Sequence, residues 1–252
     1  KNINEASRWL ELPGTELTFQ TSDLAKLALI MYIARLLSLK QDVIKSYKEA
    51  FLPVIIPVIL ICALILPANL STSLILFFVS IVLMFIGRIR FTYIAVLGSA
   101  ILILLTIIIT IAVKSDWEGR WDTWQNRIVY HLEEDSDNNY QAEQSKIAIA
   151  TGGIFGKGPG NSMQRNFLPH PYSDFIFSII IEEYGLVGGL FVVFLYLYLL
   201  FRAGIIVRKS SRTFQAFLTF GLALILVMQA MVNMAVAVGL LPVTGQPLPL
   251  IS

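Results

Sequence analysis

The stretch "DFIFSIIIEEYGLVGGLFVVFLYLYLLF", Asp174–Phe201, decides the fold class of this chain. From Phe175 onward it is almost continuously apolar, and it is longer than the roughly 20 residues that a helix needs to cross a bilayer core. It therefore predicts a transmembrane helix. The same stretch carries Asp174 at its head and Glu182 and Glu183 inside it. Because an ionised side chain at the centre of a membrane helix costs roughly 2.5–3.5 kcal/mol, we expect both glutamates to face protein or a water-filled cavity.

The composition of the whole chain also indicates a membrane protein. Its 252 residues are 56% hydrophobic and only 14% charged, and the mean hydropathy is +0.72. A soluble domain carries roughly a quarter charged residues. The net charge of +2 is too small to indicate a nucleic-acid partner. Cys62 is the only cysteine, so no disulfide can form within the chain.

Six apolar segments predict transmembrane helices. They cover roughly residues 22–39, 51–68, 70–87, 91–113, 175–201 and 214–240. The expected fold is all-α, a polytopic integral membrane helical bundle. We expect residues 1–252 to form a single membrane domain, with one long extracytoplasmic loop over residues 114–173.

The basic residues predict the orientation of this bundle. Three short connections between the segments hold Lys40, Lys45, Lys48, Arg88, Arg90, Arg202, Arg208, Lys209 and Arg212. The connections alternate along the chain and so lie on one side, which the positive-inside rule makes cytoplasmic. The loop of residues 114–173 is then outside, and Asp174 lies at the outer membrane face.

Two interpretations of the acids stay open at this point. Asp174 is a helix cap, since aspartate is a preferred N-cap residue and a negative charge there suits the helix dipole, or it is a functional acid. Glu182 and Glu183 lie roughly 12–13 Å deeper on a continuous helix. They are either neutral or paired within the bundle, or part of a functional site.

The long loop contains the glycine-rich stretch "TGGIFGKGPGNS", Thr151–Ser162. Its five glycines allow the backbone N–H groups to approach a ligand closely. The stretch lacks the spacing of a P-loop. Cations near such a backbone, here Arg127, Lys146 and Lys157, suit a phosphate or diphosphate. The alternatives are an ordinary flexible loop and solvated loop charges.

Several stretches closely resemble the FtsW/RodA, or SEDS, family. They are "YQAEQSKIAIATGGIFGKGPGNS" (140–162), "LPHPYSDFIFSIIIEEYGLVGG" (168–189) and "GLLPVTGQPLPLIS" (239–252), with "ASRWLEL" (6–12) and "FQTSDLAKLALIMYIA" (19–34) near the start. The resemblance covers essentially the whole chain. Members have about ten transmembrane helices, so we expect a fragment that corresponds to helices four to nine.

The resemblance implies a peptidoglycan glycosyltransferase. Such an enzyme polymerises lipid II at the outer face of the bacterial cytoplasmic membrane, by inverting glycosyl transfer from a lipid diphosphate donor. It works with a class B penicillin-binding transpeptidase and, in the division branch that "LLPVTGQPLPLIS" favours, with other membrane proteins at the septum. The alternatives are a flippase or transporter for lipid-linked precursors, and a non-catalytic membrane scaffold.

The resemblance also implies roles for individual residues. Asp174 matches the catalytic aspartate and would serve as general base or bind a divalent metal ion, Mg²⁺ or Mn²⁺. Glu182 and Glu183 would order the cavity behind it. His170 and Tyr172 depart from the family pattern, which has glutamate and histidine there. The resemblance and the loop charges together nominate a substrate-binding set: Lys26, Arg127, Gln141, Gln144, Ser145, Lys146, Lys157, Gly158, Gly160 and Ser162.

Overall fold

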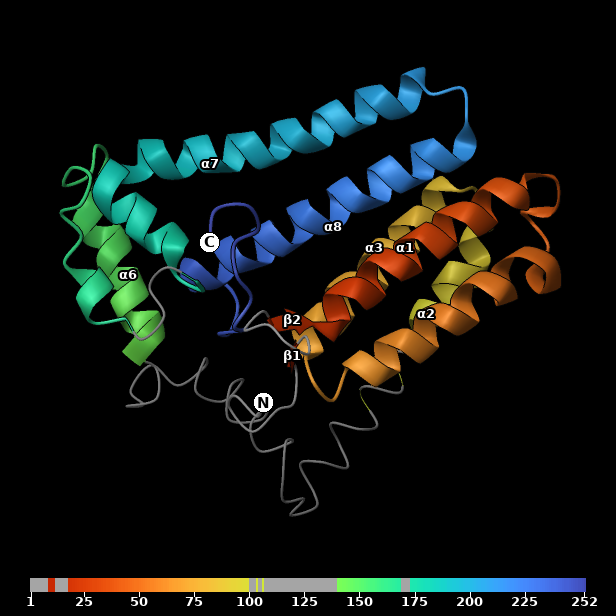
Figure 1. Cartoon of the computed structure of the whole chain (residues 1–252), viewed down its shortest axis with the longest axis horizontal. Coiled ribbons are helices and arrows are strands. Elements are labelled where there is room, and N and C mark those ends of the chain that lie inside the picture. The colour runs from red at the N-terminus through yellow and green to blue at the C-terminus, as the bar shows by residue number, and fades with distance from the viewer. Residues whose placement is uncertain (1–8, 12–17, 100–102, 104–105, 107–139, 169–172) are drawn as a thin grey trace, which may run out of the picture. The chain divides into compact units, whose positions relative to one another are not determined.

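The computed structural model describes residues 9–11, 18–99, 103, 106, 140–168 and 173–252 (Figure 1). The chain divides into two compact units. Unit 1 comprises Lys1–Lys114 and Arg202–Ile225, and unit 2 comprises Ser115–Phe201 and Leu226–Ser252. Two long helices run from one unit into the other, so the single membrane domain expected from the sequence stays a prediction.

Unit 1 is a set of packed helices with a small β-ribbon at its start. Strands β1 (Trp9–Glu11) and β2 (Thr18–Gln20) pair antiparallel, with Leu10 opposite Phe19. The helices are α1 (Thr21–Leu39), the short η1 (Gln41–Val43), the π-helical turn η2 (Tyr47–Phe51), α2 (Leu52–Ile65) and α3 (Leu70–Ile86). Residues 91–99 are also helical.

Local chemistry explains where the helices of unit 1 begin. Asn69 caps α3, because its Oδ1 accepts the Thr72 N–H at 3.1 Å. Pro53 lies in the first turn of α2, where its missing N–H has no helical partner to lose. Inside the unit, α1 buries Ile30, Ile33 and Leu37 completely.

Unit 2 contains α6 (Tyr140–Gly152), the single turn η4 (Gln164–Asn166) and parts of α7 (Ile176–Lys209) and α8 (Thr213–Ala237). Its core is formed by Phe177 and Ile181 of α7 with Val227 and Ala230 of α8. Figure 1 shows α6 beside the first part of α7. A buried polar contact joins them, since the hydroxyl of Ser145 lies 2.5 Å from that of Ser178.

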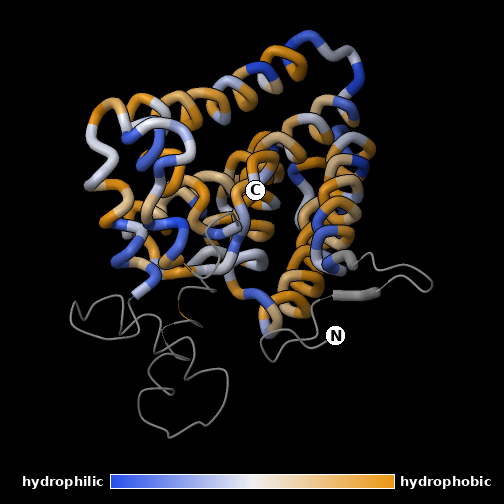
Figure 2. The backbone as a smooth tube through the Cα atoms, turned by 60° about the vertical axis from the view of Figure 1, so that its left-hand side comes forward, coloured by the Kyte–Doolittle hydropathy of each residue, from blue (hydrophilic) through white to orange (hydrophobic). Residues whose placement is uncertain are grey.

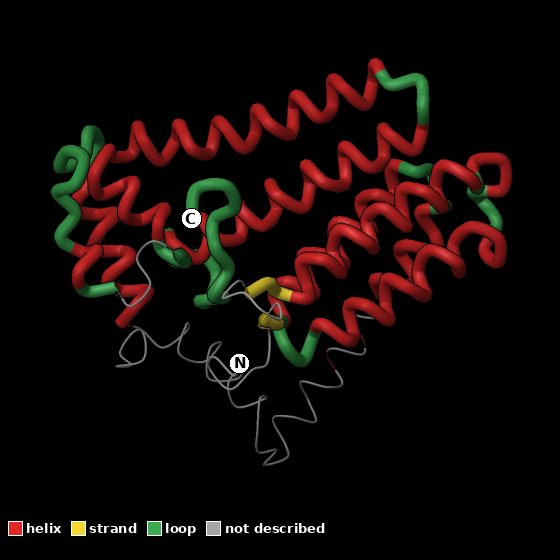
Figure 3. The backbone as a smooth tube through the Cα atoms, in the orientation of Figure 1, coloured by secondary structure: helices red, strands yellow, loops and turns green. Residues whose placement is uncertain are grey.

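The all-α fold expected from the sequence is confirmed in the described ranges (Figure 3), and the β-ribbon is an addition that was not predicted. Tyr47–Ile65, Ile176–Lys209 and Thr213–Ala237 are long and apolar enough to cross a membrane, while Leu70–Ile86 is apolar but shorter. Figure 2 shows the hydrophobic colour along these helices. The segment predicted over 22–39 is helical but carries Asp23, Lys26 and Arg35. Of the segment predicted over 91–113, residues 91–99 are helical, and most of the remainder falls outside the described residues.

One helix lies where the sequence indicated only loop. Residues 140–152 form α6, although its apolar residues do not gather on one face as they do in a helix that packs by a simple stripe. Ser145, Ala148 and Gly152 are the buried positions. Because these residues are small or polar, hydrophobic periodicity could not reveal the helix.

Candidate active site

Helix α7 is broken at Gly185, which has φ 71° and ψ −174°. Only glycine adopts such a conformation at low cost. The break frees the carbonyls of Glu182 and Glu183, and both are taken up by the glycine-rich loop. The Lys157 N–H donates to the Glu182 carbonyl at 3.0 Å, and the Gly158 N–H donates to the Glu183 carbonyl at 2.9 Å. A broken membrane helix is tolerated when neighbouring groups satisfy its backbone in this way.

The glycines of the loop allow main chain to pack against main chain. A Cβ atom on Gly156 would lie 2.2 Å from the Glu183 carbonyl oxygen, and one on Gly185 would lie 2.1 Å from that of Ile154. A Cβ on Gly152 would lie 2.2 Å from the Ile181 carbonyl oxygen. These glycines therefore serve the fit between loop and helix. Gly160, in contrast, has no atom within 4 Å of an added Cβ.

The carboxylate of Glu182 is fully buried and accepts hydrogen bonds from four donors. Its Oε1 receives the Lys157 Nζ at 2.6 Å and the Met163 N–H at 3.2 Å. Its Oε2 receives the Ser162 hydroxyl at 2.5 Å and the Gln164 N–H at 3.2 Å. A buried charge is tolerated only when it is paired and hydrogen-bonded. Glu182 thus fixes the loop on α7, and Glu183 contributes its backbone carbonyl to the same junction.

The loop then returns to the start of α7. The Arg165 N–H donates to the Ser162 hydroxyl at 3.2 Å, and the Leu168 N–H donates to the Gln164 carbonyl at 3.1 Å. Leu168 is buried in a small cluster with Phe175 and Ile179. These contacts connect the anchored loop to the residues that flank Asp174.

Asp174 is half-buried, two residues before the first residue of α7. Among the residues that the structure describes, Ser173 alone donates to its carboxylate, at 2.9 Å to Oδ1. The helix cap considered from the sequence is not formed, because no backbone N–H of the described chain donates to the Asp174 side chain, and the Phe175 carbonyl accepts the first helical bond, from Ser178. The aspartate therefore keeps most of its capacity to accept a proton or bind a cation.

A buried asparagine on α8 holds the surroundings of Asp174 in place. The Nδ2 group of Asn233 donates to the Asp174 carbonyl at 2.8 Å and to the Gln246 carbonyl at 2.7 Å. Its Oδ1 is buried and has no hydrogen-bond partner in the described part of the chain. Gly245 has φ 64°, and a Cβ there would lie 3.7 Å from Asp174 Oδ2. The segment 241–252 thus passes directly beside the carboxylate.

Two further contacts anchor this C-terminal segment. The Tyr196 hydroxyl donates to the Pro249 carbonyl, and the Gln229 Nε2 donates to the Pro247 carbonyl at 3.2 Å. Together with Asn233 they tie the segment to α7 and α8. The carboxylate of Asp174 therefore lies where the start of α7, the last turns of α8 and the C-terminal segment converge.

The structure places the other nominated residues in three groups. Gln141, Gln144, Ser145 and Lys146 lie on α6, and Lys157, Gly158, Gly160 and Ser162 lie in the glycine-rich loop. Lys26 is in unit 1, where its Nζ lies 2.6 Å from Asp23 Oδ1. Arg127, His170 and Tyr172 fall outside the described residues. The substrate-binding role of the whole set stays a prediction.

Several of these residues are already engaged within the protein, among them Ser162 with Glu182 and Lys26 with Asp23. Ser145 is fully buried, and its hydroxyl donates to the Ala237 carbonyl at 2.7 Å as well as contacting Ser178. Lys157 donates to Glu182 and, at 2.9 Å, to the Thr151 hydroxyl. Lys146 is exposed and lies against Gly239, where an added Cβ would be 2.7 Å from Lys146 Cε. Of the described cations nominated in this unit, Lys146 is the one without an ion pair.

Sequence reasoning missed Asn233, Ser178 and Gln246. Asn233 had a usable signal, because a polar amide inside an apolar span is expensive to bury without partners. The other two had none, since a serine in an apolar helix and a glutamine in a proline-rich segment are common without a role.

The part of the chain that the structure describes fits a metal site at Asp174 that the substrate completes. Among the described residues no group of three or more His, Cys, Asp or Glu side chains converges. Mg²⁺ is usually held by one or two carboxylates together with water and substrate phosphates. Asp174 supplies one such carboxylate, so it fits a metal ion that arrives with a phosphorylated substrate.

Comparison with known proteins places this arrangement in a family of membrane proteins. The family model FTSW_RODA_SPOVE, described as "Cell cycle protein", matches residues 1–252. A Geobacter sulfurreducens protein named "Probable peptidoglycan glycosyltransferase FtsW" is 36% identical over 98% of this chain and 65% of its own length. A protein of the same name from Coxiella burnetii is 32% identical over 100% of this chain and 67% of its own length.

Solved structures agree with the sequence comparison. A chain from the work "Structural coordination of polymerization and crosslinking by a peptidoglycan synthase complex" is similar with a TM-score of 0.75 and 27% identity, over 100% of this chain and 68% of that one. The crystal structure of the rod shape determining protein RodA of Thermus thermophilus gives a TM-score of 0.63 and 26% identity, over 100% of this chain and 64% of that one.

The chain therefore belongs to the FtsW/RodA/SpoVE family, as its motifs predicted. The family and the three apolar helices make it a multi-pass membrane protein. It spans about two thirds of the length of the curated relatives it matches, 65% of the Geobacter sulfurreducens protein.

Proposed function

We propose that the protein to which this chain belongs is a peptidoglycan glycosyltransferase that polymerises lipid II. The observation that carries the proposal is the contrast between two acids of one helix region. Glu182 is buried under four hydrogen-bond donors, whereas Asp174 is half-buried and accepts from Ser173 alone among the described residues. Two relatives more than 30% identical carry the name peptidoglycan glycosyltransferase.

Asp174 serves in this proposal as the general base. The acceptor sugar hydroxyl is a poor nucleophile until its proton is removed, and a carboxylate within hydrogen-bond reach can accept that proton. Asn233 and Gly245 keep the carboxylate accessible, because the asparagine binds the Asp174 backbone rather than its side chain. The hydroxyl oxygen then attacks the anomeric carbon, the bond to the lipid diphosphate breaks, and the diphosphate leaves with the electron pair.

The leaving diphosphate requires positive charge nearby. Lys157 is neutralised by Glu182 and is held away from this task by two hydrogen bonds. Lys146, and Arg165 on the turn that Glu182 and Ser162 hold in place, make no ion pair with any described residue. These two side chains, with Arg127, are the proposed diphosphate contacts. A divalent ion bound by Asp174 and the diphosphate would supply further charge stabilisation.

Transport is the competing function, because broken helices form the substrate sites of many transporters. In transporters the unwound backbone groups of a broken helix bind the cargo or its coupling ions. Here the carbonyls of Glu182 and Glu183 are instead bonded to Lys157 and Gly158 of the loop. The break thus serves to attach the loop, and this favours an enzyme over a transporter.

The partner and the location follow from the same proposal. The similar solved chain belongs to a peptidoglycan synthase complex for polymerisation and crosslinking. We extend this to a class B penicillin-binding transpeptidase as the partner of the present protein, together with other division membrane proteins. The corresponding location is the bacterial inner membrane at the septum, with the glycine-rich loop on the outer face.

The test uses the purified full-length protein with its transpeptidase and labelled lipid II. Glycan polymer should form with the unaltered protein and fall by about 10²–10⁴-fold with Asp174→Asn, the range typical of general-base catalysis. Polymer formed equally well by Asp174→Asn would reject Asp174 as the base. No polymer from the unaltered complex, with the transpeptidase active on a supplied glycan, would favour the scaffold function.

A further inference from the structure

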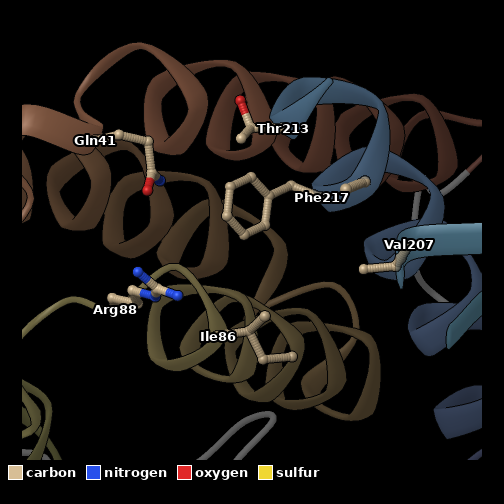
Figure 4. A pocket seen from close by; sticks show the side chains of 7 residues that line it. Gln41, Ile86, Arg88, Val207, Thr213 and Phe217 are labelled. Carbon is tan, nitrogen blue, oxygen red and sulfur yellow. The ribbon is translucent and has the colours of Figure 1, made fainter. Parts of the chain in front are cut away.

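A cavity of about 320 Å³ lies within unit 1 and contains none of the candidate active-site residues (Figure 4). Its polar lining consists of Gln41, Arg88 and Thr213, and its apolar lining includes Ile86, Val207 and Phe217. One part of the wall thus carries a cation, an amide and a hydroxyl, and the rest is hydrocarbon. This distribution suits an amphiphile.

The lining residues lie at the ends of helices. Ile86 is the last residue of α3, Thr213 is the first of α8, and Val207 lies in the last turn of α7. Gln41 follows α1 directly after Lys40. Because α7 and α8 are long and apolar enough to span a bilayer, a cavity at their ends lies at the depth of the lipid headgroups.

Arg88 has an unusual backbone at the rim of this cavity. Helix α3 ends in a Schellman motif, in which the Ile89 N–H donates to the Met84 carbonyl and the Arg88 N–H donates to the Phe85 carbonyl, both at 3.1 Å. The residue at the position of Arg88 is left-handed, with φ 68°, and it is usually glycine. A branched or long side chain adopts this conformation at a cost.

The neighbouring glycine does not serve this turn. Gly87 has φ −68°, and a Cβ on it would lie 2.9 Å from Leu37 Cδ2 and 3.1 Å from the Leu83 carbonyl oxygen. A side chain on Gly87 would therefore meet the end of the Leu37 side chain of α1, while the left-handed position is occupied by an arginine. Residues held in costly backbone conformations cluster at ligand sites.

The guanidinium of Arg88 makes no ion pair with any residue that the structure describes. In Figure 4 the side-chain ends of Arg88 and Gln41 point toward one another, with the ring of Phe217 beside them. The Gln41 Nε2 already donates to the Leu37 carbonyl at 2.6 Å, which fixes the amide at the cavity wall. An unpaired guanidinium fork beside a fixed amide matches the oxygens of a phosphate.

We propose that this cavity binds the phosphate group of an anionic membrane lipid. Arg88 contacts the phosphate, and Gln41 offers its remaining amide N–H. The first acyl carbons of the lipid lie against Phe217, Ile86 and Val207. A free phosphate ion shares the polar chemistry, but it would leave this apolar wall in contact with water. Basic pockets between helix ends bind lipid headgroups in this way in other membrane proteins.

The experiment follows thermal unfolding of the purified full-length protein in a neutral detergent. Phosphatidylglycerol, phosphatidylcholine and inorganic phosphate are titrated separately. About 0.5 M salt is present, because the Debye length then falls to roughly 3–5 Å and general surface attraction is screened. Arg88→Gln is compared with Arg90→Gln. Arg90 is exposed and lies in the same connection, but it does not line the cavity, so the two variants lose the same charge.

The expected result is a shift of the midpoint by phosphatidylglycerol whose apparent affinity falls about tenfold or more in Arg88→Gln, the loss that corresponds to one charge-assisted contact. Arg90→Gln should stay within about threefold, since it removes only a screened surface charge. Equal losses in the two variants, or an equal shift by phosphatidylcholine, would overturn the proposal. An Arg88-dependent shift by inorganic phosphate that competes with the lipid would overturn the lipid assignment.

Two further variants keep the test independent of folding defects. Ala216 also lines the cavity. Ala216→Leu fills the cavity without changing charge, and it should weaken lipid binding as much as Arg88→Gln does. An unchanged lipid affinity in Ala216→Leu would place the lipid elsewhere. Arg88→Gly suits the left-handed position, so it should raise the midpoint without lipid and abolish the further rise with lipid. A lower midpoint for Arg88→Gly without lipid would contradict the strain on which the proposal rests.

Discussion

The Oε1 atom of Glu182 lies 2.6 Å from the Nζ atom of Lys157, and the glutamate side chain is 0% exposed whereas the lysine side chain is 29% exposed. The acid belongs to α7 and the lysine to the glycine-rich loop, twenty-five residues apart in the chain. This pair, together with the three other donors to Glu182, attaches the loop at the point where the helix is broken. It also takes Lys157 out of the set of free cations.

A double-mutant cycle tests this pair. Lys157→Met should destabilise the full-length protein by about 3–5 kcal/mol, because it leaves the fully buried Glu182 carboxylate without its counter-charge. Glu182→Gln should cost about 1–3 kcal/mol, because an amide NH2 group replaces an accepting oxygen and leaves a buried donor unsatisfied, while the remaining Lys157 side chain is partly exposed to solvent. The double variant should be more stable than the sum of the single effects predicts, by about 0.5–3 kcal/mol. Unfolding midpoints in detergent measure this coupling, and strictly additive effects would show that the pair does not act as a unit.

Replacement of Asp174 should affect catalysis without affecting folding. Asp174→Asn keeps the backbone carbonyl that Asn233 binds, and no described N–H loses an acceptor on the side chain. The expected result is a normal unfolding midpoint with a loss of polymer of about 10²–10⁴-fold. Ser173→Ala is the matched control, since it removes the one described donor to the carboxylate and should change the rate far less. A folding defect in Asp174→Asn would revive a structural role for this aspartate.

The glycines at the helix break should tolerate no side chain. Gly185→Ala places a Cβ atom 2.1 Å from the Ile154 carbonyl oxygen, which is too close for two atoms that are not bonded. The φ of 71° adds further strain. We expect loss of the loop contact and faster proteolysis within residues 153–161. Gly204→Ala in the same helix meets no atom within 4 Å. It should stabilise the protein by about 0.5–1 kcal/mol, because alanine favours a helix over glycine. Similar behaviour of both variants would mean that the break is not a packed junction.

Asn233 should matter more than its half-buried counterpart Gln229. Asn233→Leu leaves the carbonyls of Asp174 and Gln246 without their donor, and an unsatisfied buried group costs about 1–3 kcal/mol. We expect slower polymerisation, because the segment beside Asp174 loses its attachment. Gln229→Ala removes the exposed contact to Pro247 and should cost about 0.5–1.5 kcal/mol or less. The polymerisation rate and the unfolding midpoint are measured for both, and an equal rate in the two variants would argue against a positioning role for Asn233.

The orientation of the membrane helices can be checked with single cysteines. In a full-length protein with Cys62→Ala, a cysteine at the exposed position Asn161 should react with an impermeant thiol reagent in whole cells once the reagent can reach the inner membrane. A cysteine at the exposed position Ser211, in the basic connection between α7 and α8, should react only after the inner membrane is broken. The reverse pattern would invert the topology and remove Asp174 from the outer face.

The sequence by itself determined that the chain belongs in a membrane, that its fold is all-α and which family it belongs to. Apolar runs such as 175–201 are longer than a soluble helix needs, and a run of this kind has no stable alternative to a helix in lipid. The family motifs identified Asp174 as a candidate because it belongs to one continuous stretch of the family pattern, Asp174–Phe177. In both cases the deciding information is local, so reading the chain in order was enough.

Only the tertiary structure decided what the charged and polar residues contact. Three contacts show this: Glu182 with Lys157, Asn233 with Gln246 and Ser145 with Ser178. The two residues of each pair are far apart in the chain, and no periodicity in the sequence predicts that they are in contact. The helix α6 escaped prediction because its buried face is made of serine, alanine and glycine, which carry little hydrophobic signal. The sequence did not predict the break at Gly185, because the carbonyls that it frees accept hydrogen bonds from a loop elsewhere in the chain. Whether a carboxylate holds the structure together or stays available for catalysis depends on how many hydrogen-bond donors surround it. That number is set by packing rather than by the local sequence.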